Sequence, residues 1–257
     1  MNSDSKVFNS NAQIYNEVRP GYPEEVYSLI AKYKNFSKES TILEIGSGNG
    51  LATKEIWRNW KSNITAIEPG KQLWDISNLL FSNNSKISIL NSSFENYNSD
   101  LQFDGIFSAT AFHWLDSTTK YISCHKLLKN DGILVLYWNN YGIADEKIEK
   151  EVQNVYKKYG FKNNGNRDDI LNIKSEKRKN EIELSGLFHL QENTLLYRKE
   201  MYGIEKYIKL LRTFPDHTES KKPKIESMFD EIRQIGNKYE NMIPVRIVVD
   251  LKIARKS

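Results

Sequence analysis

A glycine-rich turn directly after a short apolar segment constrains this chain more than any other feature. Residues 42–50 read Ile-Leu-Glu-Ile-Gly-Ser-Gly-Asn-Gly, so the glycines stand at positions 46, 48 and 50. Glycine lets the backbone bend sharply and lets a ligand come close to it, and the apolar run before it is typical of a buried strand. The segment therefore predicts a strand, a ligand-binding turn and a helix, as at the carboxyl edge of an open α/β sheet.

The spacing of the glycines discriminates between cofactors. A dinucleotide fingerprint has its third glycine three residues after the second, where this chain has Leu51. Glu68 ends the next apolar run, 64–67, where a carboxylate can accept two hydrogen bonds from ribose hydroxyls. The succession of strand, glycine turn, helix, strand and acid resembles the class I S-adenosylmethionine-dependent methyltransferases, which implies S-adenosylmethionine as the cofactor. An NAD-dependent dehydrogenase is the weakest enzyme hypothesis.

Short apolar segments alternate with amphipathic ones from position 41 onward. We expect strands at 41–45, 64–67, 87–90, 104–108 and 132–138, and helices near 50–60, 70–81 and 116–128. Such alternation builds a parallel sheet, and a helix before a last strand near 245–253 suits the final antiparallel hairpin of this enzyme class. The predicted fold is α/β: a Rossmann-like, seven-stranded, mostly parallel sheet with helices on both faces, an antiparallel last strand and a helical cap over the pocket.

The length suits a single domain with several parts. We expect one methyltransferase domain over residues 1–257, in which the parts are a helical cover at 1–40, a cofactor-binding half at 41–138, an insertion at 139–190 and a C-terminal part at 191–257.

Charge and cysteine usage limit the function classes. Lys and Arg number 37 against 33 Asp and Glu, and the net charge of +4 is scattered along the sequence. The densest basic run, 174–179, has no interleaved aromatic residues and is expected to be a solvated loop. This pattern argues against a nucleic-acid partner, and the lack of any run of about 18 apolar residues argues against membrane insertion. The sequence does not indicate the oligomeric state.

Cys124 is the single cysteine of the chain. It can form no intramolecular disulfide and no Cys-based zinc site, so we expect no metal and a cytoplasmic location. Because it lies on the apolar face of an expected helix, a buried structural thiol is the favoured interpretation.

The methyltransferase resemblance implies roles for the residues around the turn. The glycines and Ser47 would wrap the methionine part of the cofactor, Glu44 would hold its ammonium group and Glu68 its ribose. Ser93 and the backbone at Phe94 stand where the family reads adenine, although an acidic residue is common at the place of Ser93. The predicted cofactor-binding set is Tyr15, Arg19, Glu44, Gly46, Ser47, Gly48, Gly50, Glu68, Pro69, Ser93, Phe94, Ser108 and His113.

A second motif indicates one branch of this enzyme class. Ala-Phe-His-Trp at 111–114, with Tyr15, Arg19, Pro20 and Tyr22 near the start, is similar to small-molecule methyltransferases related to trans-aconitate methyltransferase. The segment Leu-Leu-Arg-Thr-Phe at 210–214 resembles the substrate-side helix of that branch. The likeness spans most of the chain and is weakest across the insertion.

By this likeness, Tyr15 and Arg19 would close over the methionine carboxylate. His113 and Trp114 would line the wall beside the sulfonium. We interpret His113 as part of that wall rather than as a proton-transfer group, although it is the one candidate for a catalytic residue. The predicted acceptor-side residues are Trp114, Tyr137, Trp138, Tyr207 and Arg212.

The predicted reaction is an in-line displacement. The sulfonium is an activated methyl donor, so the protein has to align a nucleophile and exclude water. A carboxylate acceptor is ionised at neutral pH and needs no general base, whereas a carbon, phenol or amine acceptor can need one. We therefore favour a small acid or another modest-sized metabolite.

Two rival functions stay open. A nucleic-acid methyltransferase is disfavoured, because adenine-amino enzymes carry an Asp/Asn-Pro-Pro-aromatic run where 108–111 reads Ser-Ala-Thr-Ala, and Cys124 does not follow a proline as in cytosine C5 enzymes. A non-catalytic protein that binds S-adenosylmethionine as a sensor or partner subunit has the same fold. The complete cover over the expected pocket favours the enzyme.

Overall fold

A computed structural model describes residues 17–161, 167–217 and 224–257. The chain divides into two compact units. The glycine-turn unit comprises Gly21–Asn139, Lys174–Leu196 and Val249–Ser257, and the companion unit comprises the described residues up to Pro20, with Asn140–Ile173 and Tyr197–Val248.

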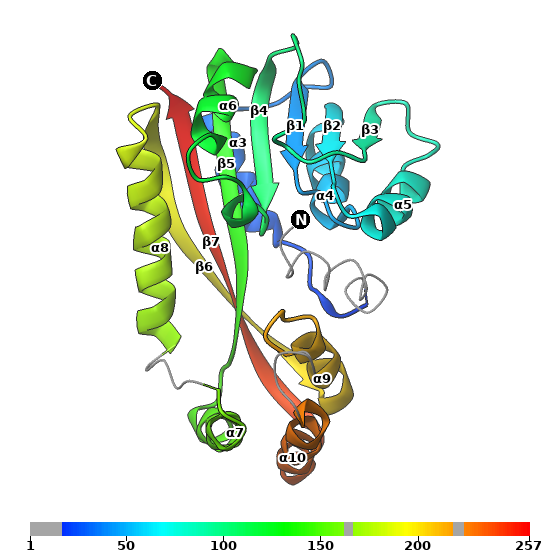
Figure 1. Cartoon of the computed structure of the whole chain (residues 1–257), viewed down its shortest axis with the longest axis vertical. Coiled ribbons are helices and arrows are strands. Elements are labelled where there is room, and N and C mark those ends of the chain that lie inside the picture. The colour runs from blue at the N-terminus through cyan, green and yellow to red at the C-terminus, as the bar shows by residue number, and fades with distance from the viewer. Residues whose placement is uncertain (1–16, 162–166, 218–223) are drawn as a thin grey trace. The chain divides into compact units, whose positions relative to one another are not determined.

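Seven strands form one sheet in the order β3-β2-β1-β4-β5-β7-β6 (Figure 1). Their bounds are β1 Thr41–Ile45, β2 Asn63–Ile67, β3 Ile87–Leu90, β4 Phe103–Ala109, β5 Leu128–Ile143, β6 Phe188–Gly203 and β7 Met242–Lys256. The pairs β1–β2, β1–β4, β2–β3 and β4–β5 are parallel, whereas β7 runs antiparallel to its neighbours. This arrangement confirms the predicted Rossmann-like sheet with an antiparallel last strand. The predicted helical cap stays a prediction.

Helices connect most of the strands. The glycine-turn unit contains α3 (Glu24–Tyr33), α4 (Leu51–Trp60), α5 (Lys71–Leu80), the short 3₁₀ helix η1 (Phe112–Trp114) and α6 (Lys120–Leu127). The companion unit contains α7 (Glu146–Lys158), α9 (Ile204–Arg212) and α10 (Ile225–Lys238), and α8 (Arg167–Leu184) has residues in both units.

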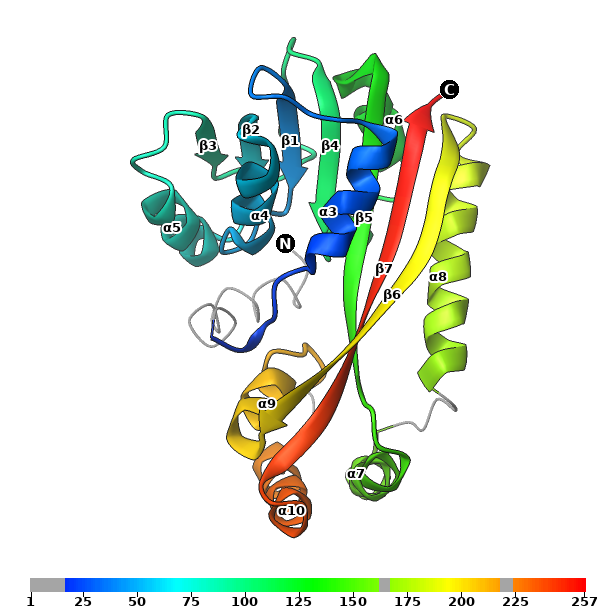
Figure 2. The same ribbon diagram turned by 180° about the vertical axis from the view of Figure 1, so that it is seen from behind.

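Separate apolar clusters cover the two faces of the sheet in the glycine-turn unit. On the face seen in Figure 2, α3 and α4 lie over the sheet. Ile30 of α3, Ile56 of α4 and Tyr137 of β5 belong to one buried apolar cluster. On the other face, Cys124 of α6 and Ile182 of α8 pack with Trp138 of β5. Burial on both faces explains the continuous apolar runs in the central strands. Cys124 is fully buried, as predicted.

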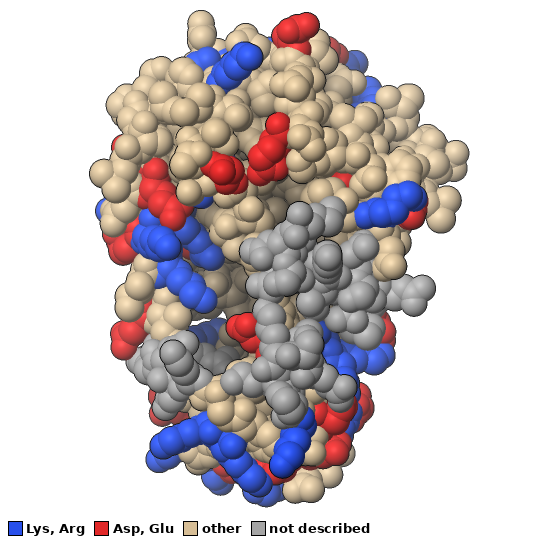
Figure 3. Space-filling view, viewed as in Figure 1, with Lys and Arg blue, Asp and Glu red and all other residues tan. Residues whose placement is uncertain are grey.

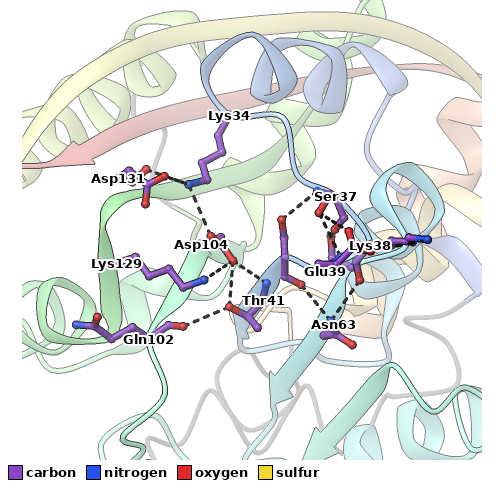
Figure 4. Close-up of polar contacts among 12 residues, drawn as sticks. Lys34, Ser37, Lys38, Glu39, Thr41, Asn63, Gln102, Asp104, Lys129 and Asp131 are labelled. Atoms are coloured by element: carbon purple, nitrogen blue, oxygen red, sulfur yellow. Dashed lines mark hydrogen bonds and ion pairs between the residues drawn. The ribbon is translucent and has the colours of Figure 1, made fainter.

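A polar network joins the amino ends of β1, β4 and β5 (Figure 4). One carboxylate oxygen of Asp104 accepts from the backbone N–H of Thr41 at 2.8 Å and from Nζ of Lys129 at 2.9 Å. Lys34, which follows α3, lies 3.8 Å from the other oxygen of Asp104 and also pairs with Asp131. This network fixes one edge of the sheet, opposite the edge that carries the glycine turn.

The interpretation of residues 174–179 as a solvated loop is wrong. The run lies within α8, and Ser175 is 5% exposed. Ser175 and Arg178, three residues apart on the helix, both bond Asp250, and Ile182, four residues further on, packs in the apolar cluster that contains Trp138. Polar side chains on a packed face are satisfied by distant partners, so composition alone does not identify such a helix.

Two observations bear on the partner predictions. Within 17–161, 167–217 and 224–257, no helix is long and apolar enough to cross a membrane. On the face drawn in Figure 3, Lys and Arg side chains are interspersed with Asp and Glu side chains.

Candidate active site

The glycine turn is tied to the neighbouring strand by its own backbone. The N–H groups of Gly46 and Ser47 donate to the carbonyl of Ile67 at 2.8 Å and 3.1 Å. Gly46, Gly48 and Gly50 all have positive φ, at 72°, 59° and 86°, which is a region that glycine enters at little cost. The turn therefore lies at the carboxyl ends of β1 and β2, where open α/β folds bind small molecules.

The three glycines serve different purposes. A Cβ on Gly46 would lie 2.3 Å from Cβ of Ala111, and one on Gly50 would lie 2.6 Å from the ring of Phe81, so both are required by packing. A Cβ on Gly48 would meet no heavy atom within 4 Å. Gly48 thus borders open space, as expected for a backbone segment that a ligand approaches.

Glu68 closes the turn from the end of β2. One of its carboxylate oxygens accepts from the N–H of Gly48 at 2.8 Å and the other from the N–H of Gly70 at 2.7 Å. Burial raises the pKa of Glu68, and the two amide donors oppose that effect only in part. Glu68 is 6% exposed, and its carboxylate lies beside Gly48, where ribose hydroxyls could replace or join the amide donors.

Glu44 is a buried acid beneath the turn. The residue is fully buried, and neither carboxylate oxygen has a hydrogen-bond partner among the residues that the structure describes. Burial raises the pKa of Glu44 to about 7, and the charge of Glu68 adds to the rise. A buried carboxylate without a donor is costly, so a cationic group such as the cofactor's ammonium fits this place.

The loop after β4 contains a strained residue that the sequence did not indicate. Thr110 has a φ of 57°, a conformation that is rare for a β-branched residue. Its hydroxyl bonds the hydroxyl of Tyr22 at 2.8 Å and accepts from the N–H of Asn139 at 3.3 Å. These contacts hold Tyr22 at the ends of β4 and β5, close to the segment that packs on Gly46. The residues that bond Thr110 are distant in the chain, so no local pattern in the sequence indicates these contacts.

His113 follows this loop and is fixed by Trp138. The indole Nε1–H of Trp138 donates to Nδ1 of His113 at 3.1 Å, and the ring of Trp114 lies 4.6 Å from that of His113. The surrounding protein lowers the pKa of His113 to about 4, first through desolvation and then through the charges of Arg178 and other cations. His113 is nevertheless an exposed residue by its solvent-accessible surface. His113 is neutral at physiological pH and a weak base, which supports the interpretation as a wall residue.

Arg178 is a further residue of this region that the sequence did not indicate. Its guanidinium carbon lies 4.1 Å from the ring centroid of Trp138, and Nη1 donates to Oδ2 of Asp250 at 2.7 Å. The sequence around Arg178 does not indicate these contacts, because Arg178 belongs to a basic run and its partner Asp250 is 72 residues away.

The remaining predicted residues of the glycine-turn unit have mostly structural contacts. The Ser108 hydroxyl donates to the carbonyl of Ile45 at 2.9 Å, and Phe94 is 5% exposed in the core. Tyr137 is fully buried on the face of β5 opposite Trp138. Pro69 and the half-buried Ser93 follow β2 and β3, and the Asn91 amide donates to the carbonyls of Glu68 and Pro69 at 2.9 Å and 3.3 Å.

Three predicted residues belong to the companion unit. Arg19 donates through Nε to the hydroxyl of Thr213 at 2.9 Å and lies over the ring of Phe214. Tyr207 is 3% exposed, and Arg212 pairs with Glu226 at the surface. Tyr15 lies outside the described residues. The structure thus groups the glycine turn, both acids, His113 and Trp138 in one unit. Within the described ranges, no cluster of His, Cys, Asp and Glu could hold a metal ion.

Comparison with known proteins gives a family match for the region around the glycine turn. Residues 43–136 match the family model "Methyltransferase domain". A probable S-adenosylmethionine-dependent methyltransferase of Saccharomyces cerevisiae, CRG1, is 28% identical over 177 residues, which are 63% of this chain and 59% of that protein. The chain therefore spans about three-fifths of the length of this curated relative.

Two solved structures share the fold. A putative type II methyltransferase from Anaeromyxobacter dehalogenans superposes with a TM-score of 0.66 at 13% identity, covering 92% of this chain and 97% of that one. A methyltransferase from Thiobacillus denitrificans, in complex with S-adenosyl-L-homocysteine, gives a TM-score of 0.54 at 13% identity, with coverage of 97% and 98%. Residues 43–136 are thus similar to a methyltransferase domain, and the solved structures show that the chain has the fold of such enzymes.

Proposed function

We propose that the chain with this methyltransferase domain transfers a methyl group from S-adenosylmethionine to a small-molecule acceptor by in-line displacement. One observation carries the proposal: the carboxylate of Glu68 faces the N–H of Gly48, next to open space and above the buried Glu44. S-adenosylmethionine has three polar parts, and each finds a suitable group here. The ribose would meet the carboxylate of Glu68, the methionine part the backbone at Gly48, and the ammonium group the buried acid Glu44.

Each residue has a proposed part in holding the cofactor. Glu68 binds the ribose hydroxyls, Glu44 attracts the ammonium group, and Ser93 with the backbone of Phe94 lies toward the adenine. Arg19, with Tyr15, is proposed for the methionine carboxylate. The bound cofactor supplies an activated methyl group, so the protein's own task is to align the acceptor and to exclude water.

The finer identity of the acceptor is also a proposal. The resemblance to trans-aconitate methyltransferases favours a small carboxylic acid, and the neutral state of His113 supports an acceptor that needs no strong general base. Tyr207 and Arg212 are proposed for the acceptor side. The cytoplasmic location stays a prediction from the single cysteine.

Product identification tests the proposal. The full chain is incubated with methyl-labelled S-adenosylmethionine and a panel of small acids, phenols and amines, and labelled products are identified by mass. We expect a labelled acid ester. Uptake of the cofactor without transfer to any member of a broad panel would favour the non-catalytic alternative.

A further inference from the structure

Trp138 determines which nitrogen of His113 carries the proton. Because the indole of Trp138 can only donate, Nδ1 of His113 accepts this bond and must be unprotonated. The proton of the neutral ring is therefore on Nε2. His113 is thus a hydrogen-bond donor through Nε2, and the indole blocks the nitrogen that could otherwise accept a proton.

Arg178 reaches the same indole from α8 and is held there by a buried acid. Asp250 is fully buried and accepts from Arg178 at 2.7 Å and from the Ser175 hydroxyl at 2.9 Å. Lys252, also fully buried, pairs with the same carboxylate and donates to Ser175 at 2.8 Å. One acid therefore faces two cations. The Arg178 side chain is 18% exposed, so its planar group is fixed on the ring of Trp138 and still reaches solvent.

Cationic side chains act on His113 and lower its pKa. They are Arg178, Lys120 and Lys174, and Arg178 is paired with Asp250. Glu181 partly neutralises Lys120, with which it forms a 3.0 Å ion pair. The cationic Arg178 and Lys120 side chains favour an anion over an ammonium group at this place.

We infer that His113 and Arg178, aligned by Trp138, form an anion-binding acceptor subsite that takes a carboxylate. This inference rests on the proposed methyltransferase function. Nε2–H of His113 and the guanidinium of Arg178 hold one carboxylate oxygen, and the other oxygen is the nucleophile. Its lone pair forms the new O–CH₃ bond while the S–CH₃ bond breaks and its electron pair stays on sulfur. The products are a methyl ester and S-adenosylhomocysteine, and no proton is released.

Matched acceptors and variants test the subsite. Small carboxylic acids and their primary amides are offered in pairs to the wild type, Arg178→Gln, Arg178→Lys and His113→Gln, with Arg58→Gln as a control. Arg58 is an exposed arginine of α4 that pairs with Glu55, so its loss removes the same charge elsewhere in the unit. Lys252 and Ser175 still satisfy Asp250 in the Arg178→Gln protein, which should therefore fold.

We expect methyl transfer to the acids and none to the amides. Arg178→Gln should raise the KM for the acid by about 10- to 100-fold, with a smaller rise for Arg178→Lys, and kcat should change less than KM. His113→Gln should also raise KM. A pH indicator should detect no proton release during turnover, and KM should not change between about pH 6 and about pH 8 because His113 stays neutral there.

Binding of S-adenosylhomocysteine distinguishes a failure of the acceptor subsite from a failure of the proposed methyltransferase function. Calorimetry should give the same affinity in the wild type and Arg178→Gln. If the wild type binds S-adenosylhomocysteine but methylates amines or amides in preference to acids, or if Arg178→Gln keeps the wild-type KM for an acid, the subsite is wrong while the methyltransferase function stands. If the folded wild type does not bind S-adenosylhomocysteine, both proposals fail.

Discussion

The carboxylate of Glu68 accepts a hydrogen bond from the backbone N–H of Gly48 across 2.8 Å, between residues 20 positions apart in the chain. The contact forms because β1 and β2 are parallel neighbours with Ile45 opposite Ile67, so both strands end at the same edge. The acid therefore faces the one glycine of the turn that borders open space. This relationship, together with the buried Glu44, carries the proposed cofactor site.

Removing the charge of Glu68 should weaken cofactor binding. Glu68→Gln keeps the size of the side chain but loses charge-assisted hydrogen bonds, so we expect about 10- to 100-fold weaker binding of S-adenosylhomocysteine. Glu25→Gln, which changes an exposed residue of α3, should bind normally. Isothermal titration calorimetry measures both. Equal affinities for the two variants would show that Glu68 does not contact the ribose.

Two glycine substitutions should separate folding from binding. Gly46→Ala places a methyl group 2.3 Å from Cβ of Ala111 and should lower the melting temperature strongly. Gly48→Ala meets no neighbour, so it should cost only about 1–2 kcal/mol of stability through its positive φ. Because its methyl group enters the space proposed for the cofactor, Gly48→Ala should nevertheless abolish binding. A folded Gly48→Ala protein with wild-type affinity would contradict this placement.

The raised pKa of Glu44 predicts a pH dependence of stability. The folded chain keeps the Glu44 proton up to about pH 7, whereas the unfolded chain loses it near the ordinary value of 4.5. The free energy of unfolding should therefore decrease as pH rises through this window, by about 3 kcal/mol at most, and then level off. Urea unfolding at about pH 5 and about pH 8 measures the slope. Glu44→Gln should flatten it, and an unchanged slope in that variant would assign the effect to another group.

Asp104 should stabilise the fold with the opposite pH dependence. Partial burial raises its pKa, but the Thr41 N–H and the Lys129 ammonium lower it by more, so the pKa lies below 3.8. This stabilisation is present above the unfolded pKa of 3.8 and is lost as pH falls through the folded value. At neutral pH, Asp104→Asn should lower the free energy of unfolding by about 1–3 kcal/mol. The exposed Asp100→Asn is the control, and equal stability of both variants would refute the role of the network.

The sequence predicted the elements whose signals are local. The strand at 87–90 has the predicted bounds, and the one at 41–45 does too, because a short apolar run between polar turns identifies a buried parallel strand. The predicted helix at 116–128 begins instead at Lys120, since the side chain of Asp116 accepts from the N–H groups of Thr118 and Thr119 in a turn. Strand β5 continues through polar residues to Ile143, beyond the predicted end at 138.

The parts of the site that depend on distant partners could not be predicted. Glu68 and the glycines lie at the ends of consecutive strands, so their approach follows from the topology. Arg178 meets Trp138 and Asp250 only after α8 packs on the sheet, and Thr110 bonds Tyr22 and Asn139, which are distant in the sequence. No short pattern around these residues indicates such contacts.

Calorimetric titration of the folded chain with S-adenosylhomocysteine, with NAD as the comparison ligand, measures whether the glycine turn and its two acids hold this cofactor. The account predicts saturable heat with S-adenosylhomocysteine, none with NAD, and none with either ligand for Gly48→Ala. A wild-type chain that is folded by circular dichroism and takes up no S-adenosylhomocysteine, or that binds NAD equally well, would contradict it.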